Sequence, residues 1–129
     1  MKLLLDTHIL LWAALDPERI SEECRTAIED GTNEVYASAV SAWEIAIKQS
    51  LGKLDLDQPA ERWLPRVLER TGIQPLPVDS TIALRVRALP WHHRDPFDRL
   101  LVAHALESGL TLVTHDRAFE RYDVSLRLG

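Results

Sequence analysis

The chain has 129 residues, a formal net charge of −5 and 46% hydrophobic residues, which predicts one soluble globular domain over residues 1–129. No apolar run is long enough to cross a membrane, and Asp6 interrupts the N-terminal apolar run too early for a signal peptide, so we expect a cytoplasmic protein. Cys24 has no second cysteine to pair with, which excludes an internal disulfide. The acidic balance argues against binding nucleic acid through bulk charge, but not against a nucleic-acid enzyme whose acids surround metal ions.

Short apolar runs alternate along the chain with stretches that carry helix caps. Strands are predicted at 3–5, 34–37, 110–113 and 124–128, with a weaker edge strand at 73–76 because Pro75 cannot donate a hydrogen bond to a neighbouring strand. Helices are predicted at 8–15, between Ser21 and Gly31, and at 38–51, 59–70, 80–88, 95–109 and 117–122, with a break or kink at Pro65. This alternation predicts an α/β fold with a mostly parallel sheet.

Two aspartates lie at the ends of buried strands. Asp6 follows the apolar run 3–5, and Asp116 lies just beyond the run 110–113. Because open α/β sheets bind ligands beyond the carboxyl ends of their strands, both carboxylates are candidates for one site. The alternative is that Asp6 or Thr7 only caps the following helix.

Glu44 lies on the apolar face of a predicted helix. At 100° per residue it shares a stripe with Val40, Ile47 and Leu51, so the carboxylate should face inward and need a cation or a metal as its partner. The alternative is a capping box, because Ser41 and Glu44 have the spacing of that motif.

Asp98 repeats this pattern on the helix that follows Asp95. It shares a stripe with Leu101, Val102 and Ala105, so it should also face the core. Asp95 is expected mainly to stabilise the positive end of the helix, and the alternative for Asp98 is the same role.

Together the four acids Asp6, Glu44, Asp98 and Asp116 can converge on one pocket, where they cannot all stay ionised without a counter-charge. Ligands that are all oxygen favour Mg²⁺ or Mn²⁺. Zinc is not expected, because the histidines lack a metal-binding spacing. His92 and His93 are predicted to lie in a loop with their side chains exposed to solvent. The sequence also lacks a phosphate-binding glycine loop and a nucleophile elbow.

Four short motifs resemble those of PIN-domain ribonucleases, and among them the VapC-like toxins of bacterial toxin–antitoxin pairs. They are LDT at 5–7, SAWE at 41–44, HRDPFDRLLVA at 93–103 and LVTHD at 112–116. Each motif alone is weak, but four in the family's order, spread over nearly the whole chain, make the resemblance specific.

The resemblance implies a PIN-like three-layer α/β/α sandwich with a central, mostly parallel sheet. It implies a Mg²⁺- or Mn²⁺-dependent endoribonuclease with Asp6, Glu44, Asp98 and Asp116 as catalytic acids, and it makes Asp95 and Thr114 accessory residues. Metal would be held by Asp6, Asp98 and Asp116, and Glu44 would complete the site directly or through water. Arg94 and Arg99 flank the acids and are candidates for holding RNA phosphates, or alternatively for pairing with Asp95 or Asp98.

The expected partners are an RNA substrate, a small antitoxin and a second copy of the chain, because Trp12, Trp43 and Ile45 would be unusually apolar on a helix surface. Three alternatives remain open at this point: a PIN-fold module that binds protein or RNA without cleavage, a DNA-directed metal nuclease, and a phosphoaspartyl phosphatase or receiver. The last is the weakest, because His8 stands where a phosphatase of this type carries a second aspartate.

Overall fold

The computed structural model describes residues 1–92 and 94–129. Within them the elements follow in the order β1 (Lys2–Leu5), α1 (Thr7–Leu15), η1 (Pro17–Arg19), α2 (Glu22–Glu29), β2 (Glu34–Ser38), α3 (Ala39–Ser50), α4 (Ala60–Thr71), β3 (Gln74–Leu76), α5 (Ser80–Arg85), η2 (Val86–Ala88), α6 (Pro96–Ser108), β4 (Thr111–Thr114), η3 (Arg117–Arg121) and β5 (Leu126–Leu128). The described strands form one five-stranded sheet in the order β3-β2-β1-β4-β5, and every neighbouring pair is parallel. The predicted α/β fold is confirmed.

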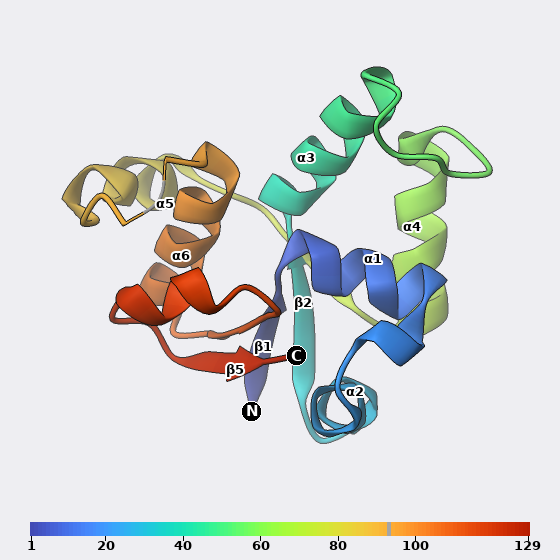
Figure 1. Cartoon of the computed structure of the whole chain (residues 1–129), viewed down its shortest axis with the longest axis horizontal. Coiled ribbons are helices and arrows are strands. Elements are labelled where there is room, and N and C mark those ends of the chain that lie inside the picture. The colour runs from blue at the N-terminus through green and yellow to red at the C-terminus, as the bar shows by residue number, and fades with distance from the viewer. Residues whose placement is uncertain (93) are drawn as a thin grey trace.

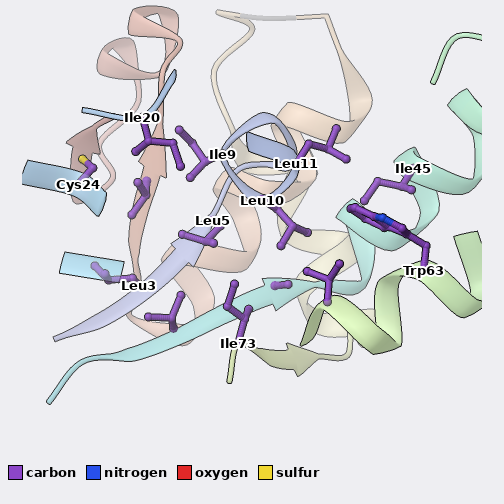
Figure 2. Packing of buried hydrophobic residues seen from close by; sticks show 14 residues of the cluster. Leu3, Leu5, Ile9, Leu10, Leu11, Ile20, Cys24, Ile45, Trp63 and Ile73 are labelled. Carbon is purple, nitrogen blue, oxygen red and sulfur yellow. The ribbon is translucent and has the colours of Figure 1, made fainter. Parts of the chain in front are cut away.

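The sheet is covered on both faces, which makes three layers. Figure 1 shows α1, α2 and α4 on one side of the strands and α5 and α6 on the other, with α3 at the end where β2 finishes. Figure 2 shows one packed layer, in which Leu3 and Leu5 of β1 share a cluster with Ile9 and Leu10 of α1, and Trp63 of α4 lies beside Ile45 of α3. Leu4 points to the opposite layer, because successive side chains of a strand alternate between its faces.

The central strands β1 and β4 correspond to the two apolar runs predicted as buried strands in the sequence. Leu3, Leu4 and Leu5 of β1 and Leu112 and Val113 of β4 are completely buried. A central strand of a parallel sheet has helices on both faces, so its residues are all apolar instead of alternating with polar ones.

Several helix ends follow the predicted local chemistry. Side-chain oxygens at the caps accept backbone N–H groups of the first turn; the capping residues are Ser21, Ser38, Asp79 and Asp95. Gly109 ends α6 with a positive φ of 65°, a conformation that glycine adopts without strain. Because Ser38 caps α3, the alternative capping box at Ser41 is wrong.

Some predicted boundaries are also wrong. Pro65 does not break α4, which runs from Ala60 to Thr71 with the proline inside it. The helix predicted at 80–88 is an α-helix up to Arg85 and a 3₁₀ helix over Val86–Ala88, and the short helix predicted at 117–122 is the 3₁₀ helix Arg117–Arg121. Within residues 1–92 and 94–129, no helix has the length and apolar character that a bilayer span requires.

Candidate functional site

Asp6 and Asp116 emerge at the same edge of the sheet, because β1 and β4 are parallel neighbours. The carboxylate of Asp6 is buried and makes no capping bond to α1. Instead the hydroxyl of Thr114 donates a 2.7 Å hydrogen bond to Asp6 Oδ2 and accepts one of 3.1 Å from the backbone N–H of Asp116. Thr114 therefore connects the two strand-end acids, and the alternative that Asp6 serves only as a helix cap is wrong.

Glu44 faces the interior from α3, as predicted, and is only 5% exposed. Its partner is a cation on the same helix: Lys48 Nζ lies 2.7 Å from Glu44 Oε2. Leu51, which was placed on the same inward stripe, is 61% exposed beyond the end of the helix. Lys48 was missed in the sequence, although its position four residues after a glutamate is a recognised signal for an ion pair.

Asp98 lies half-buried in the first turn of α6. Burial, and after it the negative charges of nearby acids, together raise the pKa of Asp98 to about 8; in order of effect these acids are Asp95, Asp6, Glu44 and Asp116. Burial also raises the pKa of Asp6, against the effect of the Thr114 hydrogen bond. The charges of four other acids affect the pKa of Asp98, so the structure places the predicted acids in one region.

Asp95 caps α6. One of its carboxylate oxygens accepts the backbone N–H groups of Phe97 at 2.8 Å and Asp98 at 3.2 Å. This confirms the expected role at the helix start, and the charge of Asp95 is also the largest electrostatic influence on the Asp98 pKa.

Arg99 does not face the acids. Its buried guanidinium lies 3.8 Å from the ring centre of Trp91 and donates to three backbone carbonyl oxygens, those of Val86, Leu89 and Pro90. The suggestion that Arg99 binds RNA or pairs with Asp95 or Asp98 is wrong, because the guanidinium instead holds the loop after α5 against α6. Arg94 is exposed and has no ion-pair partner among the described residues, so it stays a candidate for phosphate binding.

Arg99→Met is expected to destabilise the fold by roughly 2–4 kcal/mol, because three carbonyl groups, of which that of Leu89 is in a buried hydrogen bond, lose the guanidinium as a donor. The measurement is urea unfolding. Arg94→Met is the matched control and should change the free energy of unfolding by less than about 0.5 kcal/mol. Equal stability of the two variants would contradict the role assigned to Arg99.

Lys48→Met is expected to lower stability by roughly 1–3 kcal/mol, because it leaves a buried carboxylate without its cation. Glu44→Gln removes the charge that needs compensation, so the double variant should be more stable than the sum of the single changes predicts. Additive effects in a double-mutant cycle would show that the ion pair is not coupled in solution.

Two further polar contacts between side chains are buried. The Thr7 and Ser41 hydroxyls lie 2.9 Å apart in the interior and join α1 to α3. Ser38 Oγ lies 2.8 Å from His104 Nδ1, and burial lowers the pKa of that imidazole. His92 is exposed, as predicted, whereas His93 lies outside the described residues.

A family model described as the PIN domain matches residues 3–125. The chain belongs to the PIN-domain family. It is 34% identical over 115 residues to ribonuclease VapC22 of Mycobacterium tuberculosis, across 88% of this chain and 86% of that protein. The predicted family resemblance is confirmed.

Solved structures show the same fold. VapBC2 of Rickettsia felis, bound to a DNA fragment from its promoter, matches with a TM-score of 0.76 at 18% identity over 99% of this chain and 98% of that one. FitAcB of Neisseria gonorrhoeae matches with a TM-score of 0.59 at 24% identity, over 96% and 95% of the two chains. The three-layer PIN arrangement is therefore confirmed.

The acids of this PIN domain fit a hard cation by donor type. Asp6, Asp98 and Asp116 offer carboxylate oxygens, and burial together with the charges of neighbouring acids raises the pKa of Asp98. As the side chains stand, no three acids, histidines or cysteines among the described residues are arranged to hold an ion between them. The residues thus match the chemistry of a Mg²⁺ or Mn²⁺ site, although they do not form a ready-made ligand set.

Proposed function

We propose that this PIN domain is a Mg²⁺- or Mn²⁺-dependent endoribonuclease and the toxin of a toxin–antitoxin pair. The observation that carries the proposal is the convergence of Asp6, Glu44, Asp98 and Asp116, seen in the effect of the other three charges on the Asp98 pKa. A cluster of carboxylates fits chemistry on phosphodiesters, in which bound metal ions compensate the charge of both the acids and the substrate. Likeness to a protein named as a ribonuclease supports the same reading.

The residues take distinct roles in this proposal. Asp6, Asp98 and Asp116 hold the metal, which when bound polarises the scissile phosphate and lowers the pKa of an attacking water. Thr114 orients the Asp6 carboxylate through its 2.7 Å hydrogen bond, and Lys48 fixes Glu44 at the edge of the site. Arg94 is exposed at the start of α6, where it can bind an RNA phosphate. By family resemblance, the products carry 5′-phosphate and 3′-hydroxyl ends.

The test is incubation of the purified protein with a mixed single-stranded RNA pool, in Mg²⁺, in Mn²⁺ and in chelator, beside a DNA pool of the same sequences. Cleavage of RNA only when metal is present is the expected result. Cleavage of DNA alone would make the protein a DNA-directed nuclease. Binding of RNA without cleavage in either metal would make it a binding module, and both results would overturn the proposal.

We further propose an antitoxin partner and a homodimer. Trp43 is 53% exposed and packs edge-to-face on Phe97, with the two ring centres 4.9 Å apart. These two rings form an apolar surface beside the acids. Ile45 is completely buried, so it does not belong to this surface. An antitoxin that covers Trp43 and places a lysine or arginine among the acids would compete with metal. Light scattering of the chain alone, and with the product of its neighbouring gene, tests both associations; a monomer that binds no such product would contradict them.

A further inference from the structure

A recess of about 410 Å³ opens beside Asp6 and Asp116. This size lies within the range of small-molecule sites. The roles proposed for the acids do not explain the remaining residues that line it, which are His8, Trp12, His115 and Arg117. Three of these four side chains are aromatic rings.

The rings contact one another. The ring centres of Trp12 and His115 are 5.2 Å apart with planes at 72°, and those of His8 and Trp12 are 6.0 Å apart at 47°. His8 and His115 are exposed and Trp12 is half-buried. His8 is two residues after Asp6 and His115 directly precedes Asp116, so the backbone segments that position the strand-end acids also position the rings.

Two arginines lie close to the aromatic rings: Arg117 lines the recess, and Arg19 contacts Trp12. The Arg19 guanidinium lies 4.7 Å from the Trp12 ring centre. Arg117 is largely exposed, and the ion pair that it forms among the described residues is a 3.3 Å contact with Glu120 on the surface, an interaction of small energy that a stronger anion can displace.

His115 is oriented by the backbone, since its Nδ1 lies 2.9 Å from the carbonyl oxygen of Gly129. A carbonyl oxygen can only accept, so Nδ1 carries the hydrogen. In the neutral ring, Nε2 is then left as an acceptor, which suits the amino or imino hydrogens on the edge of a nucleobase.

We propose that this recess is a nucleobase subsite, in which the base next to the scissile phosphate of a single-stranded substrate contacts Trp12 and His115. The inference rests on the proposed function and extends it from the phosphate to the base. Proteins commonly bind the unpaired bases of single-stranded nucleic acids by stacking them on aromatic side chains. A base that is paired with a complementary strand is not available for this contact. Arg19 and Arg117 then face the flanking phosphates, while Asp6 and Asp116 face the bond to be cut.

The test measures binding separately from cleavage. A fluorescently labelled RNA tetranucleotide is titrated with protein at low salt in chelator, beside four versions that each lack one base. In the wild type, one abasic position should weaken binding by about 5- to 100-fold, the range expected for one stacked base. Equal affinity for the intact and abasic RNAs, or no measurable binding of either, overturns the subsite.

Variants assign the effect to the recess. Trp12→Phe keeps a ring and should keep the sensitivity to the missing base, whereas Trp12→Leu and His115→Ala should lose it. Trp91→Leu makes the same change at a tryptophan that is 77% exposed outside the recess, and should behave as the wild type. Because Trp12 packs partly on the core, thermal melts accompany each variant, and the exposed His115 tests the subsite if Trp12→Leu does not fold. A loss of sensitivity in Trp91→Leu, or its retention in His115→Ala, contradicts the proposal.

The two proposals fail differently. Metal-dependent RNA cleavage with no sensitivity to any missing base would remove the subsite and leave the nuclease. Base-dependent binding without cleavage in either metal would remove the nuclease and leave the subsite.

Discussion

Asp6→Asn, Asp98→Asn and Asp116→Asn are each expected to lower the rate of RNA cleavage by at least about 100-fold, because each removes a charged metal ligand from a site that works through charge. The change from carboxylate to amide alters little volume, so the fold should persist. Asparagine is also a good helix cap, so Asp116→Asn should keep the bond that Asp116 accepts from the Ala118 N–H. Initial rates in Mg²⁺ and Mn²⁺ give the effect, and circular dichroism checks the fold.

Asp95→Asn is the matched control for this series. It makes the same change on the same helix as Asp98→Asn, at a residue whose carboxylate is occupied in capping α6. The capping ability is retained, so activity should fall by less than about tenfold. Wild-type rates in all three ligand variants would show that the metal site is misassigned.

The second large effect links the charge of the acids to stability. Without metal, Asp98→Asn is expected to melt about 5 °C above the wild type at pH 8, which corresponds to roughly 1–2 kcal/mol for a chain of this size. The pKa of Asp98 is raised to about 8 in the folded protein, so ionisation is less favourable there than in the unfolded chain. The wild type therefore loses stability as pH rises from the unfolded pKa, near 4, to the folded value.

Melts at pH 5 and pH 8 test the sign of this effect. Other titrating groups are common to both proteins and cancel in the difference, so the advantage of Asp98→Asn should be small at pH 5 and grow toward pH 8. Metal bound only by the folded state should stabilise the wild type by about 2.7 kcal/mol at a hundredfold excess over Kd. The variant should gain less. A variant that is less stable than the wild type in chelator, and gains as much from metal, would make Asp98 a helix-capping acid.

Local signals in the sequence determined much of the fold. The apolar runs of β1 and β4 and the caps at Ser21, Asp79 and Asp95 lie where they were predicted, because they depend on burial on both faces of a strand and on hydrogen bonds within one helical turn. The parallel direction of the strands then follows from the alternation of strands and helices, whereas their order in the sheet is seen only in the tertiary structure. The position of Asp6 and Asp116 at one edge of the sheet was predictable for the same reason, since parallel strands end together.

The directions of individual side chains depended on the tertiary structure. Arg99 is adjacent to Asp98 in sequence, yet one residue along a helix is a rotation of about 100°, and only the packed loop after α5 shows which carbonyl groups receive its guanidinium. Ile45 likewise follows Glu44 and is buried because α4 packs on that side of α3. The rings of His8, Trp12 and His115 meet only because β1 and β4 are neighbours in the sheet, although more than 100 residues separate His8 from His115 in the chain.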